Sequence, residues 1–85
     1  MKINFDEMKI YTSIDKEDGV VQSIRKDFAN LIYTDGRGIE AHALALKIYN
    51  GDADTEYNDQ EIAMIRSFSN ACAPCIIDAF ARILS

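Results

Sequence analysis

Several residue types that carry chemistry are scarce in this chain of 85 residues. It has no tryptophan, one histidine, one proline, two cysteines and four glycines. Gly36-Arg37-Gly38 is too short for a phosphate-binding loop. A structural zinc site normally needs four ligands, and the only candidate set is Cys72, Cys75 and His42 with one acid. The serines have no nucleophile-elbow context, so the sequence predicts neither an enzyme nor a bound cofactor.

Basic residues are also in the minority. The chain has 9 lysines and arginines against 14 aspartates and glutamates, which gives a net charge of −5. A nucleic-acid-binding domain needs a basic surface, so this balance disfavours nucleic acid as a partner. No apolar run approaches the ~20 residues of a membrane span, and residues 1–11 contain no apolar signal core. We therefore expect a protein without membrane contact, in the cytoplasm, whose cysteines are reduced.

The most apolar stretch of the chain is residues 38–50. Placed on a helix, it is apolar nearly all the way round, and only Glu40 and Lys47 share a clearly polar stripe. A helix with this character is normally buried at the centre of a fold. We therefore expect the other segments to cover it, or part of it to face a partner.

The remaining segments predict a hairpin and further helices. Apolar and polar residues alternate from Met8 to Ile14, and the β-branched pair Val20-Val21 follows a polar turn that ends in glycine. A helix that starts at Val20 is the competing interpretation, but we favour a hairpin followed by a helix with Ser23 as N-cap. Pro74 breaks or kinks the last helical stretch. The prediction is one α+β domain over residues 1–85, with an N-terminal β-hairpin followed by a compact bundle of three to four α-helices: hairpin about 8–22, helices about 24–34, 38–50, 59–70 and 74–84.

Helical periodicity also assigns the faces of these helices. In the first helix, Phe28 and Ile32 lie on the apolar face, and Arg25 is placed on the solvent side. Asn58 and Glu61 have the spacing of a capping box, which predicts that a helix begins at residue 59.

The segment Cys72-Ala73-Pro74-Cys75 is the one motif with redox potential. A CxxC that opens a helix can contain a thiol of lowered pKa. However, the segment before it is itself a predicted helix, and the chain lacks the βαβ pattern of a thioredoxin-like sheet. Cys72 continues the apolar stripe of Ile65 and Phe68, so we favour structural cysteines over a redox site.

The connector between the second and third predicted helices is acidic, and its acids extend into the following helix. They are Asp52, Asp54, Glu56, Asp59 and Glu61. The first three match the alternating ligands of a calcium-binding loop, but its sixth position is Tyr57 in place of glycine and its twelfth is Ala63 in place of glutamate. Two interpretations remain: a solvated loop whose last acids stabilise a helix N-terminus, or an anionic patch for a basic partner.

Four segments together resemble a group of small proteins encoded by tailed phages and prophages. The segments are Lys2-Ile3-Asn4-Phe5, Lys47-Ile48-Tyr49, the acidic stretch Asp52 to Glu61, and the proline-led Pro74 to Leu84. The resemblance covers most of the chain, although a CxxC is not a feature of the group. It implies an origin in a phage or prophage and a role in assembly or host interaction, with no activity and no catalytic residues.

Three functional hypotheses follow. The leading one is a non-enzymatic phage or prophage protein that acts by protein–protein contact or self-association, in virion morphogenesis, in the host cytoplasm or on the virion. Tyr33, Tyr49 and Tyr57 are candidates for its contact surface, or else partly buried edge residues. The alternative is an acidic inhibitor or decoy that binds a basic host protein through the connector acids. The second alternative is thiol–disulfide chemistry at Cys72 and Cys75. No small-molecule substrate is indicated.

Overall fold

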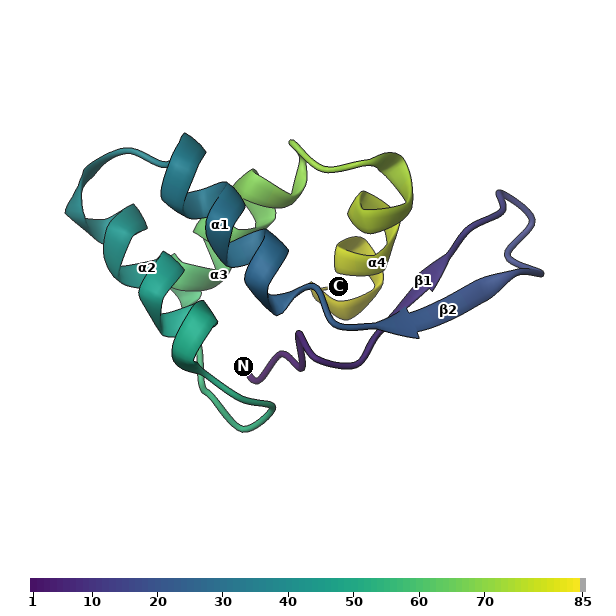
Figure 1. Ribbon diagram of the computed structural model, residues 1–85, viewed down its shortest axis with the longest axis horizontal. Helices are drawn as coiled ribbons and strands as arrows, with labels where there is room; N and C mark the ends of the chain where they lie inside the picture. Colours follow the sequence, from purple (N-terminus) through teal and green to yellow (C-terminus); the bar gives the residue numbers. More distant parts are fainter. Residues whose placement is uncertain (85) are drawn as a thin grey trace.

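The computed structural model describes residues 1–84, and it consists of an antiparallel hairpin followed by four helices (Figure 1). The elements are β1 (Met8–Tyr11), β2 (Gly19–Gln22), α1 (Arg25–Asp35), α2 (Gly38–Asn50), α3 (Asp59–Ser69) and α4 (Pro74–Leu84). The predicted α+β class, with its hairpin and helices, is confirmed. Because Pro74 is the first residue of α4 and α3 ends at Ser69, the proline separates two helices and does not kink one.

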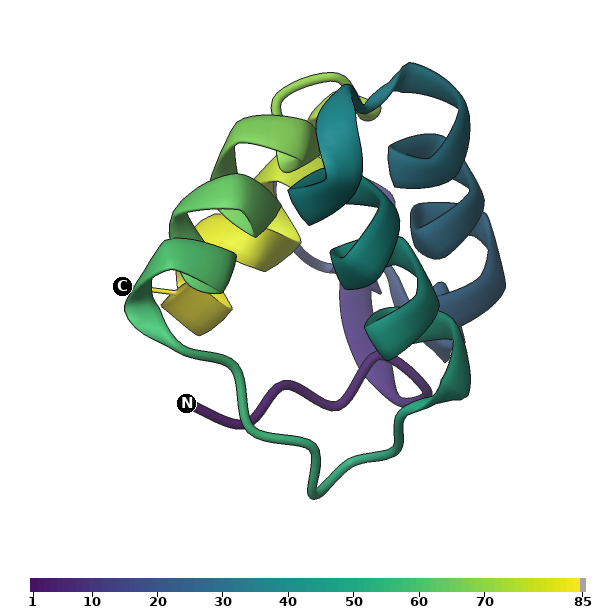
Figure 2. The ribbon, with the colours of Figure 1, turned by 90° about the vertical axis from the view of Figure 1, so that its left-hand side faces the viewer.

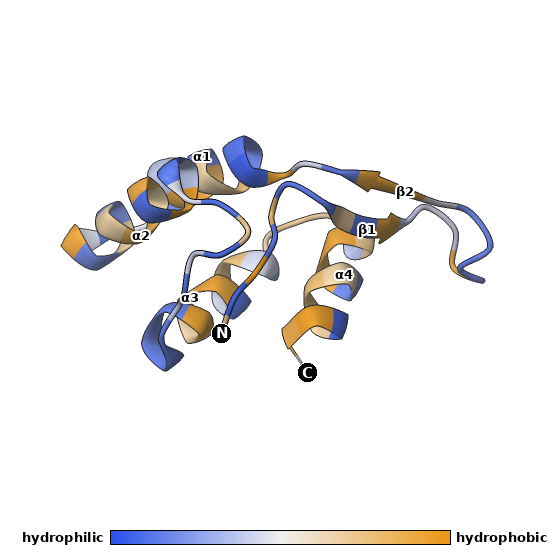
Figure 3. Cartoon of the chain, turned by 90° about the horizontal axis from the view of Figure 1, so that it is seen from below, coloured by the Kyte–Doolittle hydropathy of each residue, from blue (hydrophilic) through white to orange (hydrophobic). Residues whose placement is uncertain are grey.

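The hairpin pairs Ile10 with Val20, so Val20 belongs to a strand and does not start a helix. Met8 and Ile10 are buried, and α4 packs against β1. The alternation predicted to continue to Ile14 stops earlier, since β1 ends at Tyr11 and Ile14 is fully exposed in the loop. The hairpin loop extends past the helices (Figures 1 and 3), so no other segment of residues 1–84 packs against Ile14.

The start of α1 differs from the prediction in two ways. Its N-cap is Ile24, and the hydroxyl of Ser23 donates to Asp6 Oδ1 instead (3.2 Å). The placement of Arg25 on the solvent side was wrong, because this residue is only 6% exposed. Its Nε donates to Asp6 Oδ1 (2.9 Å) and its Nη1 donates to the carbonyl oxygen of Ile48 (2.8 Å). Arg25 therefore joins the N-terminal segment to the end of α2.

Two glycines allow α1 and α2 to form a close antiparallel pair. Gly38 has φ of +84°, a backbone conformation that residues with a Cβ rarely adopt. At Gly36, an added Cβ would lie 2.8 Å from the Cβ of Ala41, which is too close for two carbon atoms. The turn thus brings the two helices together along their length.

The expectation that the helix at residues 38–50 is buried at the centre was wrong. Helix α2 lies at the end of the molecule opposite the hairpin (Figures 1 and 2). One of its sides is buried, through Ala41, Leu44, Ala45 and Ile48. Its other side carries apolar residues but is exposed, because neither α1 nor the later segments reach around it.

An aromatic cluster forms the centre of the core. The rings of Phe5, Phe28 and Phe80 form a triangle, with centroids 5.7 Å apart for Phe5 and Phe28, 6.1 Å for Phe5 and Phe80, and 4.8 Å for Phe28 and Phe80. Tyr57 completes the cluster edge-on to Phe5, at 5.9 Å. Tyr57 is only 2% exposed, so it is neither a contact-surface residue nor a partly buried edge residue, and both predictions for it were wrong. Burial raises the pKa of its phenol, against the opposing effect of the Arg25 guanidinium.

The N-terminal segment lies along the connector between α2 and α3 (Figure 2). Lys2 and Glu56 form an antiparallel bridge, and the Tyr57 N–H donates to the carbonyl oxygen of Met1 (2.8 Å). This pairing holds Tyr57 in place against Phe5, and it explains why the connector is ordered without a helix or strand of its own.

The predicted capping box at the start of α3 is confirmed. Asn58 Oδ1 accepts from the Glu61 N–H (2.8 Å), and Glu61 Oε1 accepts from the Asn58 N–H (2.9 Å). Lys47 of α2 donates to the same carboxylate at 2.9 Å, so Glu61 ties α2 to α3. Burial raises the pKa of Glu61, but the hydrogen bonds from Asn58 and Lys47 outweigh it, and the net effect is a lowered pKa.

A carboxyl group whose pKa is lowered by folding stabilises the folded state at pH values above its ordinary pKa of about 4.3. This stabilisation is lost as the pH falls through the lowered pKa. We expect the wild type to exceed the Glu61→Gln variant in free energy of unfolding by about 0.5–1 kcal/mol at pH 7. The gap should close between about pH 5 and pH 3. Urea denaturation at a series of pH values measures it, and the isosteric glutamine keeps the capping acceptor. A gap that is the same at pH 3 and pH 7 would contradict the assignment.

Candidate protein-contact face

Large apolar side chains are exposed together on the outer side of α1 and α2. On α2, Ile39 is 83% exposed, Leu46 45% and Tyr49 48%, and Tyr33 on α1 is 61% exposed. The spacing of the three α2 residues places them on one side of the helix, away from its buried residues. Isolated exposed apolar residues are ordinary on a protein surface, whereas a large apolar patch is a feature of interaction sites, which makes this group the candidate contact surface.

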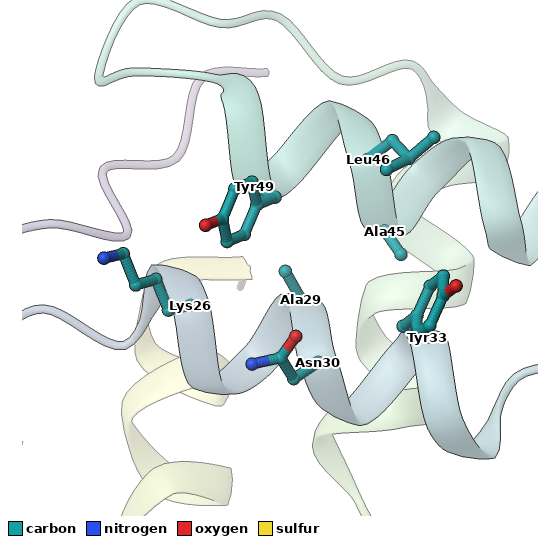
Figure 4. Close-up of a pocket in the computed structure, with 7 residues that line it drawn as sticks. All are labelled: Lys26, Ala29, Asn30, Tyr33, Ala45, Leu46 and Tyr49. Atoms are coloured by element: carbon teal, nitrogen blue, oxygen red, sulfur yellow. The ribbon is translucent and has the colours of Figure 1, made fainter.

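A groove runs between the two helices within this region (Figure 4). Its volume is about 380 Å³. Ala29 and Ala45, each 2% exposed, lie where the helices meet, and their small side chains leave the groove open. Tyr49 and Tyr33 stand toward its two ends, with Lys26 beside Tyr49 (Figure 4). Asn30 and Leu46 complete its rim.

We call this surface the α1/α2 face. It consists of Lys26, Asn30, Tyr33, Ile39, His42, Leu46 and Tyr49. Lys26 is its only residue with a full charge, and the rings of Tyr33 and His42 lie 5.9 Å apart. Low charge and exposed tyrosines are features of the buried centres of protein interfaces. The face offers apolar contact together with hydroxyl, amide and imidazole groups, which suits recognition of a protein surface.

The sequence identified Tyr33 and Tyr49 as contact candidates, and both are exposed on this face. It did not identify Ile39 or Leu46, which were assigned to a buried helix. A signal was present, because residues 39, 42, 46 and 49 repeat with the spacing of a helix–helix seam. That signal is ambiguous in a sequence, since a seam can be covered by the same chain or by another one.

The five acids proposed as a contact patch have different surroundings. Glu56 is engaged by the N-terminal ammonium group (3.0 Å), and Glu61 is engaged by the lysine on α2. The Asp52 side chain accepts from the Asp54 N–H (2.9 Å) within the connector. Asp54 is exposed, although its carboxylate lies 3.9 Å from Lys2 Nζ, and Asp59 is exposed as well. The structure therefore leaves Asp52 and Asp59, with the weakly paired Asp54, for contact with a basic partner.

The two cysteines are thiols in half-buried positions. Cys72 lies in the turn before α4, and Cys75 lies in the first turn of that helix. Burial raises the pKa of the Cys72 thiol. A redox nucleophile needs a lowered pKa, so this environment disfavours the redox hypothesis. His42, the third residue of the conceivable zinc set, is on α2, and residues 1–84 contain no cluster of three or more histidines, cysteines or acids arranged to hold a metal.

None of the helices in residues 1–84 has the length and hydropathy needed to cross a membrane. No protein-family model, curated protein or solved structure matches the chain.

Proposed function

We propose that this chain is a non-enzymatic protein of a tailed phage or prophage, which acts through protein–protein contact at the α1/α2 face, in virion morphogenesis. The observation that carries the proposal is the group of four large apolar side chains exposed on α1 and α2, three of which (Tyr33, Leu46 and Tyr49) line one groove. The phage or prophage origin comes from the resemblance of the sequence, and it gives the contact its setting in a bacterial host cell or on a virion.

Free-energy considerations support a contact at this face. Leaving a Leu, Ile or aromatic side chain in water forgoes about 1.5–3 kcal/mol of burial free energy for a complete side chain. Here Ile39 keeps 83% of its surface exposed, and Tyr33 and Tyr49 keep about half or more. A partner that covers them gains that free energy without having to reorganise the helices, because α1 and α2 are already held by the core beneath them.

The alternative function, an acidic inhibitor or decoy of a basic host protein, is supported by less. Its specific observation is the exposed Asp54, whose side chain is 89% accessible. Surface charges of this kind influence association rate and salt dependence more than affinity. Since Glu56 and Glu61 are engaged within the chain, the α1/α2 face offers more binding free energy than the connector.

A site-specific photo-crosslink tests the proposed function. A photoreactive phenylalanine analogue at Tyr49, in cells that express the chain, is expected to give covalent adducts with protein. The matched control places the same group at Asp78 on α4, which is exposed but lies outside the α1/α2 face. Adducts at residue 49 and few at residue 78 would support the proposal. Equal labelling at both positions, or none at residue 49, would refute it.

A further inference from the structure

We infer that the α1/α2 face binds a second copy of this chain, with the two α2 helices packed antiparallel about a two-fold axis. The inference rests on the proposed function, because it names the partner of the same face. Each copy then has two roles. Its Ile39 projects from one end of α2 into the second copy. At the other end of α2, its groove beside Leu46 and Tyr49 receives Ile39 of the second copy.

The spacing of the exposed seam is the first argument. Along α2, Ile39, His42, Leu46 and Tyr49 are separated by three, four and three residues. This spacing is the same when read in either direction. An antiparallel second helix therefore meets Ile39 with Tyr49 and His42 with Leu46, in both copies at once. A two-fold contact requires this self-complementarity, in which residue i touches residue j and j touches i.

Shape gives the second argument. Ile39 is 83% exposed and stands out from the N-terminal end of α2, whereas the groove of about 380 Å³ opens beside the C-terminal half of the same helix. One copy thus presents a projection and a depression at opposite ends of one face. Ala29 and Ala45 lie at the base of the groove, and their small side chains leave room in it for a side chain such as Ile39 of the second copy.

The available area is the third argument. From their exposed fractions, the four large side chains present on the order of 500 Å² to solvent. A standard interface buries about 800 Å² on each partner, and Lys26, Asn30 and His42 at the rim supply part of the rest. The face is therefore of a size that suits a weak to moderate dimer with a micromolar dissociation constant.

Charge is compatible with this arrangement. The chain carries a net charge of −5, yet the only full charge on the α1/α2 face is Lys26. Lys26 lies beside Tyr49 (Figure 4), at the end of the face opposite Tyr33. The two-fold axis leaves the two Lys26 groups at opposite ends of the interface, each near Tyr33 of the second copy, where a cation can contact a ring face.

Light scattering tests the inference by measuring the molar mass of the intact chain, with reductant, at concentrations between about 5 and 500 μM. A dimer with a micromolar dissociation constant changes its average mass over that range. We expect the mass to rise from 9.6 kDa towards twice that value. Ile39→Glu and Leu46→Glu should each weaken the dimer by about 30-fold or more. The matched control Val21→Glu, at a residue 61% exposed on the hairpin, should leave it unchanged.

Three outcomes are informative. A dimer lost in both face variants and kept in the control supports the inference. A strict monomer at 500 μM overturns the inference. In that case, photo-adducts at residue 49 whose mass differs from that of two linked copies would still support the proposed function, because the partner would be a different protein. A dimer that both face variants leave intact overturns the inference as well, because the second copy would be bound elsewhere.

Cross-linking tests the antiparallel orientation. In a Cys72→Ala, Cys75→Ala background, chains with Ile39→Cys are mixed with chains carrying Tyr49→Cys and oxidised. Antiparallel packing predicts a disulfide in the mixture and little in either chain alone, because the two copies of residue 39 lie about 15 Å apart along the helix axis. A disulfide that forms in each chain alone would refute the antiparallel arrangement.

Discussion

Replacing Phe80 by alanine is expected to lower the free energy of unfolding by about 4 kcal/mol. Phe80 is completely buried, and its ring contacts those of Phe28 (4.8 Å) and Phe5 (6.1 Å), which come from different segments. Alanine would leave a cavity among rigid rings that cannot easily move to fill it. A domain of this size has a total stability of only about 4–13 kcal/mol, so the substitution should remove at least about a third of it.

Urea denaturation followed by far-ultraviolet circular dichroism measures this loss. The matched control is Phe68→Ala, since Phe68 on α3 is only partly buried at the edge of the core. Its loss is expected to be about half as large, because less apolar surface is removed from the interior. If the two variants lose the same free energy, Phe80 does not occupy the centre of the core.

Replacing Arg25 by methionine is expected to cost about 2–3 kcal/mol. Methionine keeps most of the volume but removes the donors to Asp6 (2.9 Å) and to the carbonyl oxygen of Ile48 (2.8 Å). The Ile48 carbonyl oxygen would keep the longer hydrogen bond from the Gly51 N–H (3.3 Å) but lose the shorter, buried one from Arg25. The Asp6 side chain is 48% exposed and would regain water. The cost is therefore dominated by the lost buried hydrogen bond and by the loosened junction of α1 with the end of α2.

Thermal and urea unfolding of the variant test this prediction against Arg37→Met, the same substitution at an exposed position. The Arg37 variant is expected to stay within about 0.5 kcal/mol of the wild type. Asp6→Asn should have an intermediate effect, because the amide oxygen can still accept from Nε without the charge. Equal stability of the two methionine variants would show that Arg25 is not a structural link.

Local signals explain why the elements could be predicted. The α2 helix was predicted over residues 38–50 and occupies that range, because glycines mark both of its ends. The capping box fixed the start of α3, and Pro74 fixed the start of α4. These signals act within a few residues, so they do not depend on how the helices pack.

Burial was harder to predict, because it depends on segments that are distant in sequence. Helical periodicity placed Arg25 on the solvent side of its helix, but its partners are Asp6 and Ile48. No periodicity within α1 reveals those partners. The helix at residues 38–50 was expected to be covered by the other segments or to face a partner in part, and Ile39 and Leu46 are exposed because no segment within residues 1–84 covers them. The groove likewise forms only where two helices meet.

The pairing of the N-terminal segment with the connector has a consequence for how the chain folds. Met1 and Glu56 are 55 residues apart, and their contact brings Phe5 to the rings of Phe28 and Phe80. The helical pair α1/α2 needs only local contacts and can form within microseconds, whereas closing the long loop carries a larger entropy cost. Because the aromatic cluster is complete only after that closure, the packing of its rings stabilises the product of the last folding step and not that of the first. Helices that form early therefore remain weakly held until the chain closes, so the whole domain should appear and disappear in one cooperative transition.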